Sequence, residues 1–204
     1  MISRADRRAA PGDGFRHEAV LYTRVDGLVA SLVPWMRDGV EQGDMVVALV
    51  TGRSGDALRK GLGPAQRSVD FADMGSTGSN PGRLIALWRR VLAEARAPGR
   101  PVRGVGEPVW PGRRPDELVE CRLHEALVNP AFADETAVWV KCLYDVGALE
   151  REAFGDVGTT HPEVEGSDGH DVGAYRGPPA PADILGGPLS APTEPVVEEE
   201  VSIA

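Results

Sequence analysis

The chain has 204 residues, of which 42% are hydrophobic, and this is enough for one domain with a real core. Full disorder, a collagen-like repeat and a small disulfide-bonded scaffold are therefore excluded. The formal charge of −9 is uneven, because residues 1–154 hold 21 basic and 21 acidic residues and the last fifty carry the whole excess. A neutral body with an acidic tail does not offset phosphate charge, so we expect no nucleic-acid partner.

Signals for membranes and export are also missing from the sequence. No apolar run approaches the roughly 20 residues that a membrane-spanning helix needs, so we expect no membrane association. Residues 1–16 contain no apolar stretch of the kind found in secretory signals. We therefore expect a cytoplasmic location, with Cys121 and Cys142 as reduced thiols.

Short β-rich runs alternate with helical patterns from the amino end onward. A strand is predicted at Glu18–Thr23, followed by a helix from Asp26 to Gly43. Pro34 lies within that helical pattern and predicts a kink or an irregular first part. Met45–Val50 is a continuous apolar run, typical of a strand that is buried on both faces. A short helix is predicted at Asp56–Gly61.

The alternation continues through the second half of the patterned region. A strand is predicted at Ser68–Phe71, and Asn80 with Pro81 forms a cap and first-turn proline that predict a helix start. The remaining predicted elements are a strand at Val102–Val105, a helix at Pro115–Asn129, a strand at Ala137–Leu143 and a helix at Val146–Phe154. Five such alternations predict an α/β domain of three layers with a largely parallel sheet.

Composition divides the chain into a polar lead at residues 1–14, a patterned zone at 15–154, and a tail from 155 onward. The tail holds seven prolines, eight glycines and a single basic residue. It has too few large apolar side chains to offset the entropy cost of ordering, so we expect it to be mostly disordered. His161 and His170 are accordingly expected to be exposed to solvent.

The segment Gly106–Arg113 follows a predicted strand, at the sheet end where ligands of parallel sheets bind. It combines a carboxylate, an indole and a guanidinium with rigid prolines. One interpretation is a ligand wall, with Trp110 as an apolar platform and Glu107 as acceptor or general base. The alternative is a stiff crossover in which Trp110 covers the edge of the core and Glu107 pairs with an arginine.

The predicted helix Pro115–Asn129 carries a second set of reactive residue types. Helical spacing places Glu120, Cys121 and His124 on one face, where they could form an acid/base pair or, together, three metal ligands. Alternatively, a neighbouring carboxylate fixes His124 and Cys121 packs as a small hydrophobe. The segment lacks the second histidine of the zinc-protease helix motif, and we expect neither a metal nor a cofactor.

Two strands carry further polar groups. Cys142–Asp145 closes the last predicted strand and brings a thiol, a phenol and a carboxylate to one sheet end, although Cys142 could equally belong to the core. His17 and Tyr22 lie on opposite faces of the first strand, so at most one of them lines a given surface. No phosphate-binding loop of the Gly-x-x-x-x-Gly-Lys-Ser/Thr type occurs, and the glycine-rich segment 75–82 has no lysine.

Several segments, in order from about Phe15 to Pro162, resemble the MEDS family, the sensory domain named for methanogens, methylotrophs and the dichloromethane-responsive regulator. The segments that carry this resemblance are Phe15–Tyr22, Phe71–Met74, Asn80–Arg83, Gly104–Arg113, Glu120–Asn129 and Cys142–Asp145. One departure is Leu143, which stands where the family usually has a proline between the cysteine and the tyrosine.

The resemblance implies a RecA/KaiC-like α/β fold that has lost its phosphate loop. It also implies the sensing of small molecules, such as hydrocarbon derivatives, by a domain that often precedes a kinase-like ATPase domain in anti-sigma regulators. It places the sensory domain at residues 15–162, between a disordered lead (1–14) and a disordered acidic tail (163–204). No ATPase or helix-turn-helix segment follows, so we expect a stand-alone module.

The expected function is a non-catalytic sensory module for signal transduction, in transcription or sigma-factor control. A small, mostly apolar molecule would bind between Trp110 and Tyr144, with Glu107 and His124 as polar anchors, and would shift the loop 106–114 against a separate regulatory protein. That partner is expected to be an anti-sigma or kinase-like ATPase component. The expected ligand-binding residues are His17, Tyr22, Glu107, Trp110, Arg113, His124, Glu125, Tyr144 and Asp145.

Two other functions stay open at this point. The first is an enzyme that acts on a small molecule through Glu107, His124 or Cys142. The second is a ligand-independent interaction partner in a sigma-factor switch, in which the pocket has no role.

Overall fold

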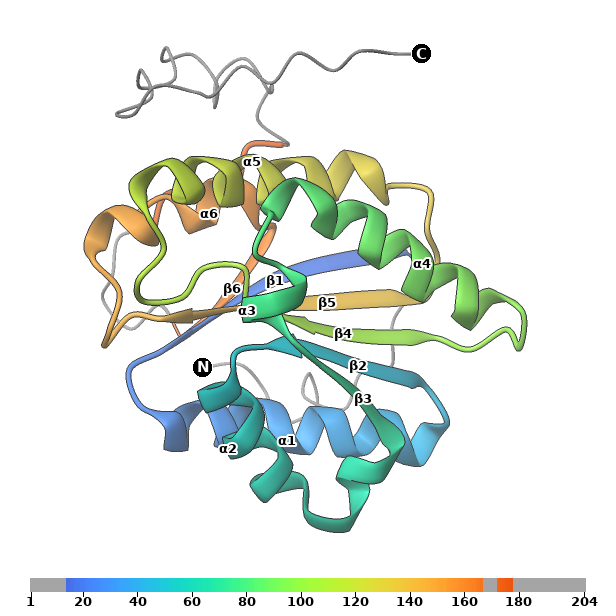
Figure 1. The fold of residues 1–204 in the computed structure, drawn as a ribbon. Helices are drawn as coiled ribbons and strands as arrows, with labels where there is room; N and C mark the ends of the chain where they lie inside the picture. The colour runs from blue at the N-terminus through green and yellow to red at the C-terminus, as the bar shows by residue number, and fades with distance from the viewer. Residues whose placement is uncertain (1–13, 167–171, 178–204) are drawn as a thin grey trace, which may run out of the picture.

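The computed structural model describes residues 14–166 and 172–177. Its strands form one six-stranded sheet in which every neighbouring pair is parallel, in the order β3-β2-β4-β5-β1-β6. Helices cover both faces of the sheet (Figure 1), which confirms the predicted three-layer α/β fold. The strands are β1 (Phe15–Tyr22), β2 (Met45–Val50), β3 (Val69–Asp73), β4 (Val102–Gly106), β5 (Val138–Asp145) and β6 (Glu163–Glu165).

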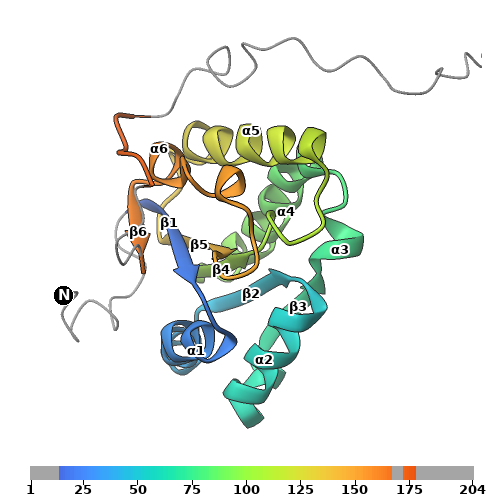
Figure 2. The same ribbon diagram turned by 90° about the vertical axis from the view of Figure 1, so that its left-hand side faces the viewer.

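The helices connect successive strands across the sheet. The α-helices are α1 (Val25–Gln42), α2 (Gly52–Leu62), α3 (Met74–Thr77), α4 (Leu84–Arg96), α5 (Pro115–Ala131) and α6 (Val157–Thr160). The short 3-10 turns are η2 (Gly63–Ser68), η3 (Pro81–Arg83) and η4 (Arg151–Ala153). Figure 2 shows α1 and α2 on one side of the sheet and α4, α5 and α6 on the other.

Alternate side chains of each strand enter two separate hydrophobic cores, one on each face of the sheet. Val20 and Leu143 pack with α1 and α2, whereas Ala19, Leu21 and Cys142 pack with α4 and α5. His17 and Tyr22 therefore belong to opposite faces, as the alternation predicts. This division decides which polar groups can meet.

Most predicted elements lie where the sequence places them. The predicted strand Met45–Val50 is β2 residue for residue. Helix α1 ends at Gly43, whose backbone has the left-handed φ of 83° that glycine tolerates. Pro34 lies inside α1, yet the helix is continuous from Val25 to Gln42.

The last predicted helix, Val146–Phe154, is wrong. The chain turns after β5 because the Val146 amide donates to the Tyr22 carbonyl at 2.9 Å, which ties it to β1. At Gly147 a Cβ atom would lie 2.5 Å from the Thr23 carbonyl oxygen, so the two backbones are in close contact there. A single 3-10 turn, η4, is the helical part of this region.

The region from residue 155 to 166 is also not the disordered tail expected from composition. It forms α6 and the edge strand β6, and β6 pairs in parallel with β1 through Glu18↔Glu163. His161, expected to be exposed, is 1% exposed. His170 and the acidic segments of the expected tail lie outside the described residues.

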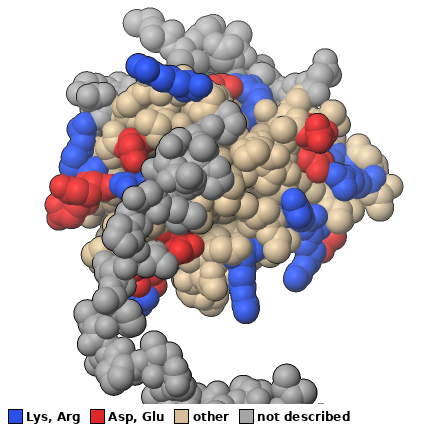
Figure 3. Space-filling model, turned by 90° about the horizontal axis from the view of Figure 1, so that it is seen from above, with Lys and Arg blue, Asp and Glu red and all other residues tan. Residues whose placement is uncertain are grey.

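Charged side chains of both signs are interspersed on the face that α4 and α5 cover (Figure 3). Over the part of the chain that is described, no helix is both long and apolar enough to cross a membrane.

Candidate functional site

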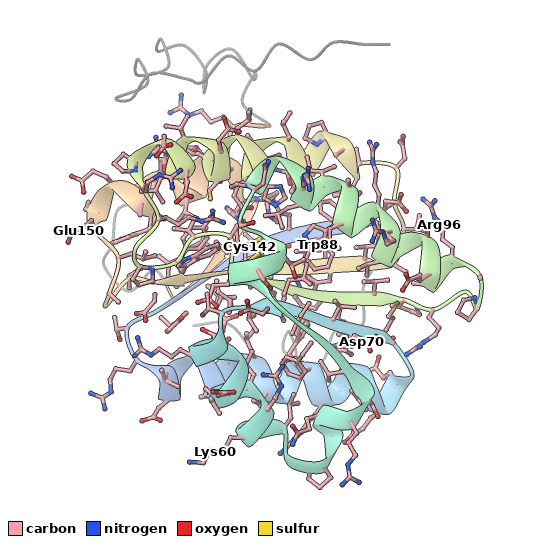
Figure 4. The ribbon with its side chains drawn as sticks, viewed as in Figure 1. Lys60, Asp70, Trp88, Arg96, Cys142 and Glu150 are labelled. Carbon is pink, nitrogen blue, oxygen red and sulfur yellow. The ribbon has the colours of Figure 1, made fainter. Side chains whose placement is uncertain are left out.

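Four polar side chains from distant parts of the chain meet inside the molecule, between the sheet and α5. They are His17 on β1, Glu125 on α5, Cys142 on β5 and His161 directly after α6, and we call them the four-residue cluster. All four are buried, and their nitrogen, oxygen and sulfur atoms lie within 4.8 Å of one another. Figure 4 shows Cys142 on the α5 side of the sheet.

Strand pairing explains why these side chains share one face. Strands β1 and β5 are parallel neighbours, and Ala19 on β1 is opposite Cys142. His17 lies two residues before Ala19, so the pleat turns it toward the same face as Cys142. Helix α5 covers that face and contributes Glu125 from its buried side.

The Glu125 carboxylate is the centre of the cluster. Its Oε2 atom lies 3.0 Å from Nε2 of His17 and 3.2 Å from Nε2 of His161. Nε2 of His17 is also 3.4 Å from Sγ of Cys142. The two imidazole rings have centroids 4.1 Å apart.

Burial and mutual charge shift the pKa values in the cluster. Burial lowers the pKa of His17 from 6.5 to about 4, an effect that His161 increases and Glu125 opposes. Burial acts to raise the pKa of Glu125, but the neighbouring His161 and His17 outweigh it, and that pKa lies well below its usual range. Burial, together with Glu125, raises the pKa of the Cys142 thiol well above its usual range. Cys142 is thus a neutral thiol and a poor nucleophile in this environment.

A partly enclosed depression lies beside the cluster, and its inner space is about the size of one water molecule. Glu125 and Tyr144 line its inner end, and burial raises the pKa of the Tyr144 phenol well above its usual range. The lining residues are Val109, Leu118, Arg122, Glu125, Tyr144, Glu152, Ala153, Asp156, Val157 and Thr160.

Half of the residues that line the depression lie within residues 149–161, which we call the roof segment. Arg122 on α5 joins α5 to it, because its Nη2 donates to the Glu152 carbonyl at 2.8 Å and its Nε lies 3.0 Å from Asp156 Oδ2. Both charged side chains are about 40% exposed (41% and 42%), so this ion pair is screened by water. The roof segment also carries His161 into the cluster.

Glu107 occupies a second polar site, at the carboxyl end of β4. Its Oε2 accepts from the Thr51 amide at 2.7 Å and the Thr51 hydroxyl at 2.8 Å, and its Oε1 accepts from the Ser54 hydroxyl at 2.9 Å and the Tyr22 hydroxyl at 3.4 Å. Burial raises the pKa of Glu107, although these hydrogen bonds oppose the shift. Thr51 precedes α2, so the carboxylate lies at a helix N-terminus, where negative charge is favourable.

The loop between β4 and α5 is fixed by Arg113. Its guanidinium lies 3.5 Å from the centroid of the Trp110 ring. It also donates to the carbonyl oxygens of Pro108 at 3.0 Å, Ser79 at 3.1 Å and Gly78 at 2.7 Å. Trp110 is therefore stacked on an arginine of its own loop.

Residues 16–162 match the model of a family described as the methanogen/methylotroph, DcmR sensory domain, abbreviated MEDS. The match covers more than half of the chain and includes all four residues of the cluster. The chain belongs to the MEDS family. No curated protein and no solved structure matches it. Family membership gives this MEDS domain a sensory or regulatory role, and its relation to RecA/KaiC folds stays a prediction.

The structure divides the nine expected ligand-binding residues of this MEDS domain among four places. His17, Glu125 and Tyr144 lie at the cluster and the depression, and the buried His124 lies on α5. Glu107, Tyr22 and Asp145 belong to the α2 side, where Asp145 pairs with Arg53 at 3.4 Å. Trp110 and Arg113 stack on each other in the loop. The depression is lined by Tyr144 and not by Glu107, whose carboxylate contacts Ser54 of α2.

The helix constellation predicted from Glu120, Cys121 and His124 does not assemble. Cys121 donates its thiol hydrogen to the Pro108 carbonyl at 3.2 Å, and burial raises its pKa to about 12. His124 is buried, which lowers its pKa, and its Nδ1 has no hydrogen-bond partner among the described residues. The adjacent Glu125 joins the cluster instead, because helix rotation turns it toward β1 and β5.

Sequence reasoning missed His161, the fourth member of the cluster. Its position in a proline- and glycine-rich region suggested solvent exposure. The signal that could have found it is the family resemblance itself, which extends past His161 to Pro162 and so includes it in the domain.

The enzyme hypothesis names Glu107, His124 or Cys142 as the residue that acts on a small molecule. Glu107 faces α2, whereas Cys142 and His124 lie on the α5 side, so the sheet separates the carboxylate from the other two. The three residues therefore do not form one catalytic site.

Proposed function

We propose that this MEDS domain is a sensory module that binds a small, mostly apolar molecule in the depression under the roof segment. The observation that carries the proposal is the position of that depression. It is lined by Glu125 and Tyr144, and from the roof segment by Glu152, Ala153, Asp156, Val157 and Thr160. A molecule bound there contacts Glu125 of the cluster and the roof segment together.

The lining favours a small molecule with one polar end. Val109, Leu118, Ala153 and Val157 supply apolar surface. The Tyr144 hydroxyl supplies a neutral hydrogen-bonding group at the inner end, and burial raises its pKa further above the usual value.

Ligand entry is coupled to movement, because the inner space holds only about one water molecule. A larger molecule has to displace the roof segment, and Arg122 is the side chain that must release Glu152 and Asp156. Binding then shifts the population of roof-segment conformations. We propose that a separate regulatory protein, of the anti-sigma or kinase-like ATPase type, reads this shift.

The experiment is a thermal-shift series with dichloromethane, 1-propanol and toluene as probes. A probe at about 100 times its Kd raises the free energy of unfolding by about 2.7 kcal/mol, which moves the Tm by several degrees. Ala153→Leu fills the depression and is expected to abolish the shift. Ala97→Leu makes the same chemical change at an exposed site after α4 and is expected to preserve it.

A Tm shift of equal size in both variants would place binding elsewhere in the domain. No shift with any of the three probes would contradict an apolar small-molecule site. It would favour the ligand-independent interaction module, for which stable complex formation with a regulatory protein in the absence of any probe is the positive evidence.

A further inference from the structure

We propose that the four-residue cluster binds one divalent transition-metal ion of the zinc class. The ligand atoms are Nε2 of His17, Nε2 of His161, one carboxylate oxygen of Glu125 and Sγ of Cys142. These atoms lie within 4.8 Å of one another in the interior. The proposal goes beyond the sensory function above, because it needs no organic ligand and rests on a different set of contacts.

The outer nitrogens of both imidazole rings are already held by oxygen atoms. Nδ1 of His17 lies 3.1 Å from Oδ1 of Asn129, whose amide nitrogen donates to the Thr160 carbonyl at 2.7 Å. Nδ1 of His161 lies 2.9 Å from the Val157 carbonyl oxygen. Amide and carbonyl oxygens only accept, so each Nδ1 carries the hydrogen. When a metal ion replaces any proton on Nε2, the lone pair of that nitrogen faces the cluster, which is the arrangement that holds histidine metal ligands.

The possible ligand atoms of the cluster therefore converge. The Nε2 atoms of His17 and His161 face the same Oε2 of Glu125, at 3.0 and 3.2 Å. Within the described part of the chain, the buried Glu125 Oε1 has no hydrogen-bond partner, and the 3.2 Å contact of His161 Nε2 with Glu125 Oε2 lacks the geometry of a hydrogen bond. Such atoms are costly to bury. A proton on one Nε2 satisfies a single contact, whereas a metal ion at the centre satisfies both rings and the carboxylate.

The donor set selects the class of metal. Two imidazole nitrogens, a carboxylate oxygen and a thiolate sulfur suit zinc and its neighbours among the transition metals, whereas magnesium and calcium prefer oxygen ligands. The charge of the ligand set also favours a divalent ion. A 2+ ion balances the Glu125 carboxylate and the Cys142 thiolate, so the buried site is neutral. The metal–sulfur bond forms as the S–H bond breaks, and the proton leaves to solvent.

The shortest contacts of the cluster have nearly tetrahedral spacing. Metal–ligand bonds of 2.0–2.3 Å place tetrahedral ligand atoms about 3.3–3.6 Å apart. The 3.0, 3.2 and 3.4 Å contacts of the cluster lie near this range, and all four ligand atoms lie within 4.8 Å of one another. Side-chain rotation has to bring any wider pair closer to complete the site.

Metal binding at this point would also fasten the roof segment. Three ligands belong to the sheet and α5, and the fourth, His161, ends the roof segment. The bound ion would cross-link these parts, so we expect chelation to speed amide hydrogen exchange in residues 149–161 more than in β2 or β4.

The test is Co²⁺ binding to the full chain after chelator treatment, with a parallel preparation expressed in cobalt-supplemented medium to bypass slow entry into a buried site. We expect one Co²⁺ per chain, an intense visible band of tetrahedral cobalt, and a near-ultraviolet band from thiolate coordination. Stoichiometric Zn²⁺ is expected to remove both bands. Failure of both preparations to retain one Co²⁺ with these bands would overturn the proposal, leaving a hydrogen-bonded network.

The two cysteines provide a matched pair of variants. Cys142→Ser is expected to lose the near-ultraviolet band, while Cys121→Ser, which alters a buried thiol outside the cluster, is expected to keep it. Asn129→Ala removes the support of His17 Nδ1 and is expected to weaken metal binding about 10- to 100-fold. Bands that persist unchanged in Cys142→Ser would contradict the assignment. Wild-type Co²⁺ spectra decide the proposal even if a variant fails to fold, and they are independent of the outcome with the organic probes.

Discussion

His17 and His161 lie against each other inside the domain, with ring centroids 4.1 Å apart, although β1 and the end of the roof segment are at opposite ends of the matched sequence. Both rings contact the Glu125 carboxylate. The contact between the two ends of the domain therefore involves ionisable groups, and the stability of this MEDS domain is expected to depend on pH.

Acidification from pH 7 to pH 5 is expected to destabilise the metal-free protein through His17. The native pKa of about 4 lies below the unfolded value of 6.5, so the unfolded state gains a proton first and stability is lost as the pH falls through this interval. The expected loss from this residue is about 2 kcal/mol between pH 7 and pH 5. Urea denaturation at both pH values, in chelator, measures it.

His17→Gln provides the comparison that isolates this contribution. The variant removes the titrating ring, which His161, His124, Glu125 and Cys142 face, and leaves those groups in place. The raised pKa of Glu107 has the opposite effect on the pH dependence, because the native state takes up a proton at Glu107 before the unfolded state does, so stability increases as the pH falls. The variant is therefore expected to lose less stability than the wild type over the same pH interval. An identical pH dependence in the two proteins would show that His17 does not titrate as the structure indicates.

Glu107→Gln is expected to destabilise the fold by about 2–4 kcal/mol at pH 7. Each carboxylate oxygen of Glu107 accepts two hydrogen bonds. In glutamine an NH₂ group replaces one of these oxygens, so two hydrogen-bond donors lose their acceptor inside the protein. Glu150→Gln makes the same change at an exposed carboxylate (Figure 4) and is expected to stay within about 0.5 kcal/mol. Chemical denaturation compares the two, and equal effects would refute the role given to Glu107.

Arg113→Lys is expected to cost about 2–3 kcal/mol and to change the fluorescence of Trp110. A lysine cannot stack its charge on the indole while donating to three separate carbonyl groups in fixed directions. Arg114→Lys is the matched control, because Arg114 is 68% exposed in its side chain and its partners are surface carboxylates. Thermal denaturation with tryptophan emission is the measurement. A tolerated Arg113→Lys would mean that the loop is held by other contacts.

Two glycines of α1 are expected to respond in opposite directions to the same substitution. A Cβ at Gly39 would lie 2.6 Å from Cδ of Arg103, whose Nε is fixed by Asp44 at 2.6 Å, so Gly39→Ala is expected to cost about 2–4 kcal/mol. Gly27 has no atom within 4 Å of that position, and Gly27→Ala is expected to add up to about 1 kcal/mol. Urea unfolding of both variants checks the signs, and a stabilising Gly39→Ala would show that Arg103 can move.

Local patterns in the sequence determine the secondary structure of most of this domain. The apolar run Met45–Val50 and the spacing of Leu28, Leu32, Trp35 and Met36 define a buried strand and the core side of a helix. Both elements can be predicted from the periodicity of apolar residues, because periodicity depends only on residues that are close in the sequence. The three-layer architecture follows from the alternation of such segments.

Only the tertiary structure decided which polar residues meet. Glu107 follows β4 and Cys142 lies within the adjacent strand β5, yet their side chains face opposite sides of the sheet, and Glu125 rather than Glu120 reaches β1 and β5 from α5. His161 enters the cluster because β6 pairs with β1 and brings the roof segment over the sheet. Long-range pairing and helix rotation set these contacts. Both depend on the packing of the whole chain, so they cannot be predicted from local sequence patterns.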